Sequence, residues 1–120
     1  TLVGHGAMVS VLLQAAVLAE SEGISCEVID LRSLSPIDYA PILDSVRQTG
    51  RMVYAQEAPG NVSVGSEVAA TVMERAFYSL EAPVIRVSGF DTPFPPAKLE
   101  GTYLPDPDRV LEAVDRVLAY

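Results

Sequence analysis

The sequence predicts an α/β fold in which helices cover both faces of a doubly wound, mostly parallel sheet, giving three layers. Short apolar segments alternate with longer helical patterns along the 120 residues, which is typical of parallel strands joined by crossover helices. Right-handed crossovers then put helices on both faces of the sheet. No repeat or change of composition divides the chain, so we expect one domain over residues 1–120.

The first half of the chain contains two expected strand–helix units. The helical patterns stop at Gly23 and Gly50, because glycine readily takes the left-handed conformation just past a helix end. A capping hydroxyl, an early proline and a first-turn acid occur together in Ser35-Pro36-Ile37-Asp38, which is a helix start signal. The expected elements are a strand at residues 2–3, a helix at 7–22, a strand at 25–31 and a helix at 35–49.

The second half is expected to add a third unit, a fourth strand and a last helix. Proline fixes φ and donates no amide hydrogen, so we expect the proline-rich segment 89–107 to be a stiff loop. A proline between two acids, in Asp106-Pro107-Asp108, marks the start of the last helix. The expected elements are a strand at 51–55, a loop at 59–61, a helix at 64–80, a strand at 83–88 and a helix ending near Tyr120.

The first helix differs from the last in the distribution of its apolar residues. Two apolar stripes run along it, and a helix that is apolar nearly all round is buried on both sides. A domain of this size has little material to cover the outer stripe. We therefore expect a partner domain or subunit in contact with Val11, Ala15 and Leu18; an alanine-rich surface helix is the alternative. The last helix has one stripe, and Glu112 and Arg116 are spaced to pair on its wet side.

Charge and composition exclude several classes of protein. The formal net charge is −8, and the basic residues do not cluster as a nucleic-acid-binding surface requires. No stretch approaches the roughly 20 apolar residues of a membrane span, so no membrane partner is expected. Cys26 is the single cysteine, which excludes an internal disulfide. The chain starts within an expected strand and lacks the basic start of a signal peptide, so we expect a fragment of a longer subunit.

Two glycine-containing segments imitate known sites. Gly4-His5-Gly6 lies between a strand and a helix, and Asp30 ends the next strand, as in a dinucleotide-binding fingerprint. Val9 stands where that fingerprint has its packing glycine, so a free-standing dinucleotide-binding domain remains only an alternative. The run Asn61-Val62-Ser63-Val64-Gly65 resembles a nucleophile elbow without its first glycine. No His or Cys spacing indicates a metal site, and we assign no catalytic, cofactor-binding or metal-binding residue.

A polar pair is expected where the winding of the sheet changes direction. His5 follows the first strand and Glu57 follows the third. In a sheet of strand order 2-1-3-4 these strands flank the switch point, where ligands usually bind. The pair could serve catalysis, anchor an interface or form a buried hydrogen bond. Without a second catalytic group, the structural role is favoured.

A set of short segments occurs in one order along essentially the whole chain. They are Glu27-Val28-Ile29-Asp30-Leu31-Arg32, Leu34-Ser35-Pro36, Thr49-Gly50-Arg51, Glu57-Ala58-Pro59, Gly65-Ser66-Glu67, Ala82-Pro83-Val84, Arg86-Val87, Asp91-Thr92-Pro93-Phe94-Pro95 and Tyr103-Leu104-Pro105. Each is weak alone, but the ordered set resembles the C-terminal domain of E1 β subunits of 2-oxo acid dehydrogenases. The segment 91–95 looks most like the branched-chain enzymes.

This resemblance implies a transketolase C-terminal-domain-like fold and a role in assembly and docking. Family enzymes oxidatively decarboxylate a 2-oxo acid, here a branched-chain acid or pyruvate, and pass the acyl group to lipoyl-E2. Thiamine diphosphate and magnesium bind outside this domain, so the domain alone is expected to be inactive. The implied partners are the E1 α subunit, a second β subunit and the peripheral subunit-binding domain of the E2 acyltransferase. The equivalent domain of another transketolase-like thiamine enzyme is a further alternative.

The resemblance also supplies a partner for the acidic C-terminal part of the chain. Asp106, Asp108 and Tyr120 are expected to belong to a surface that holds a basic patch on E2. Charge complementarity of this kind mainly speeds encounter and sets specificity. An ordinary solvated acidic face is the alternative. The family implies a cytoplasmic enzyme in bacteria or a mitochondrial matrix enzyme in eukaryotes.

Overall fold

The computed structural model describes residues 1–120 and contains four strands and five α-helices. The strands are β1 (Leu2–Gly4), β2 (Val28–Asp30), β3 (Val53–Pro59) and β4 (Ile85–Gly89). The α-helices are α1 (Met8–Ser21), α2 (Ala40–Thr49), α3 (Val64–Ala76), α4 (Glu100–Tyr103) and α5 (Pro107–Leu118). Two short 3-10 helices are η1 (Phe77–Ser79) and η2 (Ala97–Leu99).

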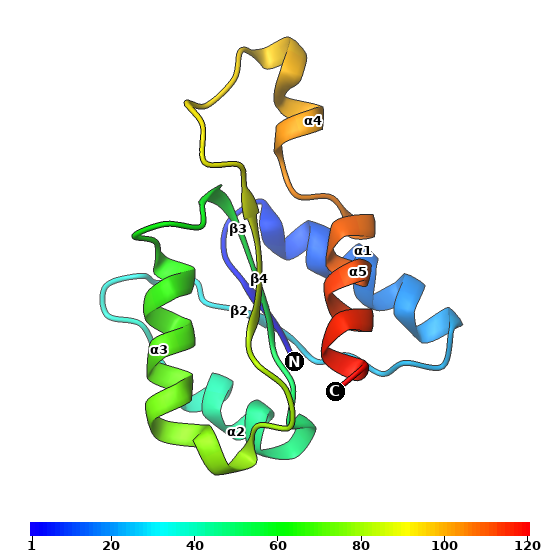
Figure 1. Ribbon diagram of the computed structural model, residues 1–120, viewed down its shortest axis with the longest axis vertical. Coiled ribbons are helices and arrows are strands. Elements are labelled where there is room, and N and C mark those ends of the chain that lie inside the picture. Colours follow the sequence, from blue (N-terminus) through cyan, green and yellow to red (C-terminus); the bar gives the residue numbers. More distant parts are fainter.

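The sheet is parallel throughout and has the strand order β2-β1-β3-β4. Helices α1 and α5 lie on one face, and α2 and α3 lie on the other (Figure 1). The chain changes face between β1 and β3, which makes the sheet doubly wound. The predicted fold class, strand order and three layers are therefore confirmed.

Alternate residues of the strands contribute to two separate hydrophobic cores. Successive side chains of a strand point to opposite faces, so Leu2 joins the core under α1 and α5 while Val3 joins the core under α2 and α3. Strand β3 divides in the same way, with Val53 on the first side and Tyr54 on the second. Leu12 of α1 is fully buried in the first core. The two cores hold the strand ends, and hence any site at either edge, in fixed positions.

Helix α2 begins five residues later than its sequence signal predicts. The expected start at residue 35 is wrong, because the helix runs from Ala40 and has Pro41 in its first turn. The Asp38 carboxylate accepts a hydrogen bond from the Ala40 amide at 3.1 Å. An acidic side chain can satisfy a backbone amide from outside the helix, so Asp38 precedes α2 and does not belong to its first turn.

Strand β3 is longer than predicted and carries one of the candidate site residues. It continues to Pro59, and β4 pairs with it from Val53↔Ile85 to Pro59↔Gly89, with an irregular register between Ala55 and Pro59. This pairing keeps the backbone extended beyond the expected end at residue 55. Glu57 therefore lies inside β3 and does not follow it, which corrects its expected position.

Residues 90–106 form an arm that projects beyond the carboxyl ends of the strands (Figure 1). The expected loop contains two helical turns, η2 and α4, which the sequence reading missed. The Tyr103 hydroxyl donates to the Phe90 carbonyl at 3.1 Å, and Arg109 donates to the Ser88 carbonyl at 2.5 Å. The Arg109 guanidinium also lies 4.9 Å from the centre of the Phe90 ring. The base of the arm is thus tied to β4 and α5, and Lys98 lies exposed near its tip.

Candidate functional site

The carboxyl edge of the sheet joins His5 to a tyrosine. His5 Nδ1 and the Tyr54 hydroxyl are 3.0 Å apart, and the two rings are tilted with centroids separated by 6.2 Å. Desolvation by burial, with a smaller contribution from Tyr39, raises the pKa of Tyr54 to about 12. The phenol is therefore neutral at ordinary pH and serves as a hydrogen-bond partner for His5.

Glu57 does not complete a pair with His5. Its side chain is exposed, and no hydrogen bond or ion pair joins it to another residue. The neighbouring Gln56 is the buried polar residue at this edge: its amide nitrogen donates to the carbonyls of Ala58 and Pro59, and its oxygen accepts from the Gly65 amide at 2.8 Å. Gln56 thus closes the turn after β3 and holds the start of α3. A lone glutamine with three satisfied bonds is structural, and the sequence reading missed it.

Gly65 shows how closely α3 approaches β3. A Cβ atom there would lie 2.7 Å from Gln56 Oε1 and 2.7 Å from Tyr54 Cδ1. Both distances are shorter than van der Waals contact, so only glycine fits. The close approach fills the space between helix and strand beside the switch point.

The turn that imitates a dinucleotide fingerprint is a compact strand-to-helix connection. The first amides of α1 bond within the turn, with Met8 donating to the His5 carbonyl and Val9 to the Gly6 carbonyl. Asp30, in the ribose position of the fingerprint, accepts the Arg32 amide and forms an ion pair with the Arg32 side chain at 3.3 Å. The donors that would hold a phosphate are therefore already used, which disfavours the dinucleotide alternative.

The three predicted interface residues of α1 differ in their exposure to solvent. Ala15 is fully buried in the core under α1 and α5, because it faces the sheet, and it is therefore removed from the expected contact surface. Val11 is half-buried against the same core, whereas Leu18 is exposed. The outer face of α1 consists of Leu13, Val17 and Leu18, with Val17 being 67% exposed. Of the three predicted residues only Leu18 belongs to this face, and Leu13 and Val17 take the places expected for Val11 and Ala15.

A hollow lies beside the outer face of α1. It has a volume of about 360 Å³ and is lined by Leu13, Ala16, Val17, Glu20, Ser25, Cys26 and Val28. Residues 25–28 of this lining lead into β2, the strand at one edge of the sheet. The exposed apolar surface therefore extends from the helix to the open edge of the sheet.

The expected acidic docking residues lie at opposite ends of α5. The Asp106 carboxylate is the N-cap of the helix and accepts the Arg109 amide at 2.9 Å, and Asp108 lies exposed in the first turn. Tyr120 follows the last turn, and twelve residues of helix span about 18 Å. The three residues therefore do not form one patch. The predicted ion pair between Glu112 and Arg116 is wrong, because these side chains are not within ion-pair distance.

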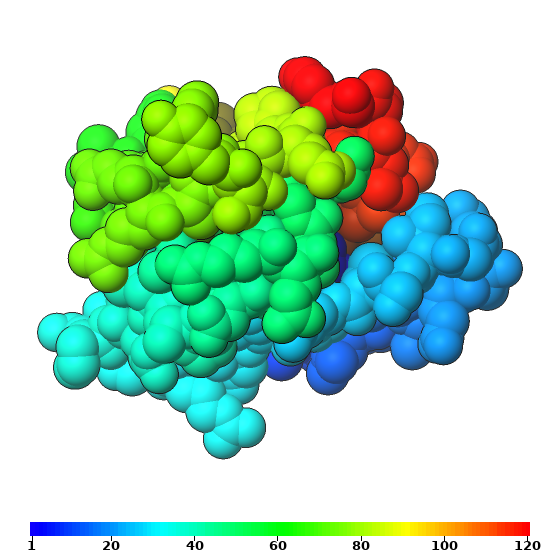
Figure 2. Space-filling view, turned by 90° about the horizontal axis from the view of Figure 1, so that it is seen from below, coloured from blue at the N-terminus to red at the C-terminus, as the bar shows by residue number.

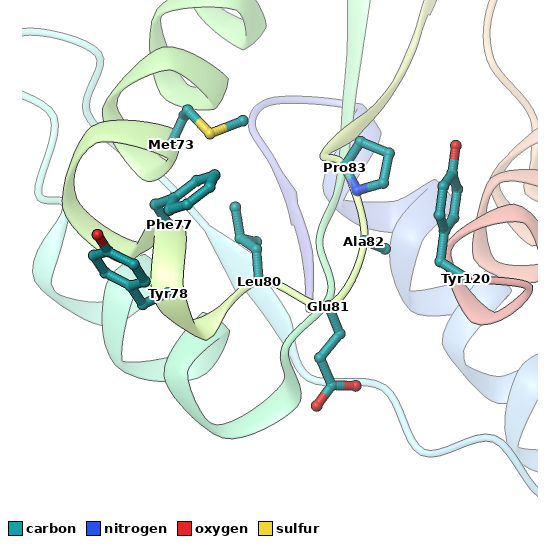
Figure 3. A pocket seen from close by; sticks show the side chains of 8 residues that line it. All are labelled: Met73, Phe77, Tyr78, Leu80, Glu81, Ala82, Pro83 and Tyr120. Atoms are coloured by element: carbon teal, nitrogen blue, oxygen red, sulfur yellow. The ribbon is translucent and has the colours of Figure 1, made fainter.

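A larger apolar hollow lies at the amino edge of the sheet (Figure 3). It has a volume of about 510 Å³ and is lined by Met73, Phe77, Tyr78, Leu80, Glu81, Ala82, Pro83 and Tyr120. Tyr78 is 99% exposed and Tyr120 is 74% exposed. Seen from below, the surface of residues near 73–83 lies next to the C-terminal residues (Figure 2). We call this feature the amino-edge hollow.

Arg51 fixes the wall of the amino-edge hollow. Its Nε donates to the Val117 carbonyl at 2.9 Å, and its Nη1 forms an ion pair with Glu81. A cation at the last carbonyls of a helix is favoured by the helix dipole. Arg51 therefore joins the end of α5 to the segment that leads into β4, and it holds the segment bearing Tyr120 beside Glu81.

The side chains offer no fit for a magnesium–diphosphate group. No three His, Cys, Asp or Glu side chains lie close enough to hold a metal ion. We therefore derive no step through thiamine diphosphate on this chain.

None of the helices has both the length and the apolar character needed to cross a bilayer.

Comparisons with known proteins match the chain to a protein family. A family model described as the transketolase C-terminal domain matches residues 1–110. Over 120 residues the chain is 72% identical to the pyruvate dehydrogenase E1 component subunit beta of Leifsonia xyli, covering 100% of this chain and 36% of that protein. It is 50% identical over 119 residues to the 3-methyl-2-oxobutanoate dehydrogenase subunit beta of Mycobacterium tuberculosis, covering 98% and 34%.

A solved structure agrees with these relatives. It is described as a split gene transketolase, inactive beta4 tetramer, and superposes with a TM-score of 0.84 at 36% identity, covering 98% of this chain and 37% of that one. The chain thus spans about a third of the length of the curated relatives it matches. Since the family match runs over nearly all of the sequence, and the parallel sheet superposes on a transketolase, the chain belongs to the transketolase C-terminal domain family.

Proposed function

We propose that this chain is the C-terminal domain of an E1 β subunit in a 2-oxo acid dehydrogenase, where it assembles subunits and docks E2. Relatives that cover the whole chain are β subunits of pyruvate and branched-chain 2-oxo acid dehydrogenases. These relatives favour the E1 component of a 2-oxo acid dehydrogenase over the alternative of another transketolase-like thiamine enzyme. Since both substrate classes occur among them, the segment 91–95 is too small a basis for preferring the branched-chain acids. The relatives are bacterial and mitochondrial, which supports the cytoplasm or the mitochondrial matrix as the location.

The proposal assigns the decarboxylation to parts of the enzyme outside these 120 residues. Thiamine diphosphate, when bound there with magnesium, supplies the chemistry that cleaves the carboxylate from the 2-oxo acid. On this chain the one polar pair at the switch point is His5 hydrogen-bonded to Tyr54, and no carboxylate or nucleophile is hydrogen-bonded to either side chain. We expect the isolated domain to bind no thiamine diphosphate. Micromolar binding of the cofactor with magnesium, measured by calorimetric titration, would contradict this assignment.

The observation that carries the docking proposal is the amino-edge hollow in an acidic chain. Exposed apolar side chains gather there, and Glu81 stands among them with its side chain 63% exposed. Binding sites between proteins commonly have an apolar centre that dominates the affinity and charged groups at the rim. The basic peripheral subunit-binding domain of E2 fits this combination of an apolar centre and a carboxylate, and neither Asp106 nor Asp108 lines the hollow. Tyr120 keeps its proposed role, whereas Asp106 and Asp108 lie at the other end of the helix.

Assembly with the E1 α subunit or a second β subunit is the role proposed for the outer face of α1. Leu13, Val17 and Leu18 are exposed although α1 already buries Leu12 and Ala19 in the core. The face has no charged residue between Met8 and Ala19. An uncharged aliphatic surface of this kind is typical of a lasting contact between subunits.

The experiment measures binding of the E2 subunit-binding domain to the assembled E1 by calorimetry, from low to high salt. We expect Tyr78→Ala to weaken binding at least tenfold and Glu81→Gln to weaken it less, with a shallower dependence on salt. The matched control is the double change Asp106→Asn and Asp108→Asn, which removes two carboxylates from the same chain. If the control weakens binding and Tyr78→Ala does not, docking occurs at the other end of α5. If E1 binds no E2 at any salt concentration, the proposed function is wrong.

A further inference from the structure

A small polar hollow lies between the edge strand β4 and helix α5, which run side by side (Figure 1). It has a volume of about 140 Å³ and is lined by Ile85, Arg86, Val87, Arg109, Glu112, Ala113 and Arg116. Three of the eight basic residues of this acidic chain are among them. Pockets that enclose a whole drug-sized ligand have volumes of roughly 300–1,000 Å³. The hollow therefore has room for one small polar group and not for a nucleotide.

Helix α5 contributes two arginines and one glutamate to this hollow. Arg109, Glu112 and Arg116 are three and four positions apart, which places them on one face of the helix. Arg116 and Glu112 are exposed, and neither forms an ion pair with any residue of the chain. Two guanidinium groups and one carboxylate leave this face with a net charge of +1, although the chain as a whole carries −8. The face therefore attracts an anion on a molecule that elsewhere repels anions.

The Arg109 guanidinium is held in place without being neutralised. It donates to the Ser88 carbonyl at 2.5 Å and to the Tyr103 carbonyl at 3.4 Å, and it lies 4.9 Å from the centre of the Phe90 ring. None of these partners carries a charge. A guanidinium group has five N–H donors, so three remain for a ligand. Because the group is already ordered, a ligand that binds to it loses little side-chain entropy.

Strand β4 supplies a backbone donor on the same side. Its Ile85 amide donates towards β3, to the Met52 carbonyl at 3.1 Å. Since alternate residues of a strand bond to opposite sides, the Arg86 amide points away from β3, where β4 has no neighbouring strand. The Ser88 carbonyl points the same way and accepts from Arg109. The Arg86 side chain is engaged with the loop after β3, so only its amide is counted as a donor to the hollow.

We propose that this hollow binds a phosphate group, either free or at the end of a small metabolite, through Arg109, Arg116 and the Arg86 amide. A phosphate monoester carries about −1.5 to −2 charges at pH 7 and has three free oxygens, which suits two guanidinium groups and an amide from different elements. A carboxylate has two oxygens, which a single arginine satisfies. Glu112 opposes any anion, so the more highly charged group is preferred. The inference does not depend on E2 docking, since no residue lines both this hollow and the amino-edge hollow.

The test is a calorimetric titration of the assembled enzyme with inorganic phosphate at constant ionic strength. The enzyme is first loaded with thiamine diphosphate and magnesium, so that its diphosphate site is filled. We expect a dissociation constant on the order of 1 mM, because a single group makes few contacts. Acetate should bind about tenfold more weakly than phosphate, because it has one charge and two oxygens. Glycerol 3-phosphate distinguishes the sources: tighter binding than phosphate identifies a metabolite, and equal binding identifies the free ion.

Three substitutions locate the binding. Arg116→Gln should weaken phosphate binding about tenfold, because a charge-assisted hydrogen bond is lost. Glu112→Gln should strengthen it about threefold, because an exposed carboxylate no longer opposes the anion. The matched control is Arg47→Gln, which removes an equal charge from α2 on the opposite face of the sheet and should leave binding unchanged. Absence of saturable binding overturns the inference. Equal losses in Arg116→Gln and Arg47→Gln also overturn it, and so does equal affinity for acetate and phosphate.

Discussion

Helices α1 and α5 pack side by side on one face of the sheet and share one structural task (Figure 1). Each buries an apolar stripe in the same core, with Leu12 and Ala15 from α1 and Val110 and Val114 from α5. Their outward surfaces differ. Helix α5 presents charged residues to water, whereas α1 presents Leu13, Val17 and Leu18 and carries no charge from Met8 to Ala19.

Helix α5 therefore shows what a helix on this face of the sheet needs. It covers the sheet with one apolar stripe, so the fold does not require a second apolar stripe on α1. The ends of the helices differ in the same direction: α5 has a carboxylate N-cap, an acid in its first turn and Arg116 in its last, and α1 has none of these. Helix α5 is stabilised by its own ends, which suits a helix in water. The outer face of α1 is better explained by a contact that the isolated domain lacks.

Truncating the buried stripes should have the largest effect and should affect the two helices alike. Leu12 and Val110 are both fully buried. Leu12→Ala should lower the free energy of unfolding by about 2–5 kcal/mol, because a cavity remains where the side chain was. Val110→Ala removes less apolar volume and should cost roughly 2 kcal/mol. Urea denaturation of the two variants measures both values. A loss under 1 kcal/mol for Leu12→Ala would break the shared role.

The comparison can be extended to the opposite face of the sheet, where the side chain of Tyr54 is buried. The folded-state pKa of Tyr54 is raised to about 12 by burial, and an exposed tyrosine titrates near 10. The neutral phenol thus contributes stability that is complete below about pH 10 and is lost as the pH rises towards 12, by roughly 2–3 kcal/mol. Tyr54→Phe should remove this part of the alkaline loss. Urea midpoints at pH 9 to 12, compared with the natural chain, test it; parallel curves would contradict it.

Removing the cap of α5 should have a smaller effect than either core change. Asp106→Ala deletes the carboxylate that accepts the Arg109 amide and should destabilise the domain by about 1 kcal/mol. Asp106→Asn is the matched control, since asparagine caps nearly as well. The shift in thermal midpoint measures both. An equal loss in the two variants would mean that the charge matters more than the hydrogen bond.

The reciprocal change in α1 should bring little gain. Ala7 stands at the N-cap of α1 with a helical backbone (φ −61°, ψ −25°), whereas Asp106 caps α5 from an extended backbone. A capping side chain reaches the first amides only from the extended conformation, so Ala7→Asp should add no more than the ~0.5 kcal/mol that a negative charge contributes at a helix N-terminus. A gain above about 1 kcal/mol would show that α1 can be capped as α5 is. The same urea titration as for the core variants decides the outcome.

Changes on the outer faces of α1 and α5 should alter the free energy of unfolding least, but they should differ most in their effect on subunit association. Leu13→Gln with Val17→Gln, and Glu112→Gln with Asp115→Asn, should each stay within about 0.5 kcal/mol of the natural chain. Only the α1 pair should weaken association of the assembled E1, by tenfold or more, in sedimentation measurements. Equal association of both variants would show that the outer face of α1 is an ordinary surface.

The sequence allowed good prediction wherever a local signal and a buried stripe coincided. Helix α5 was found from Asp106-Pro107-Asp108 and one apolar stripe, and the strand order followed from alternating elements. The start of α2 was missed because Ser35-Pro36 carries the same signal as a true start. Helix α4 was missed because four residues that include Gly101 show no helical period.

The candidate sites were harder to predict because they join residues that are distant in the sequence. The amino-edge hollow combines residues 73–83 with Tyr120, and no periodicity relates them. The hydrogen-bond partner of His5 is Tyr54 and not Glu57. Both residues belong to β3, but it is the Tyr54 hydroxyl that reaches the His5 ring.

The exposed end of the arm has a practical consequence for measurement. Lys98 is the only lysine of the chain, and it lies near the tip of a segment whose base Arg109 and Tyr103 hold to the body. The domain therefore has a single side-chain amine, so an amine-reactive fluorophore used above about pH 8 can label only Lys98 among its side chains. Since the tip is separated from its anchors by two short helical turns, the anisotropy of such a dye would report how the arm moves in solution and whether a neighbouring molecule stills it.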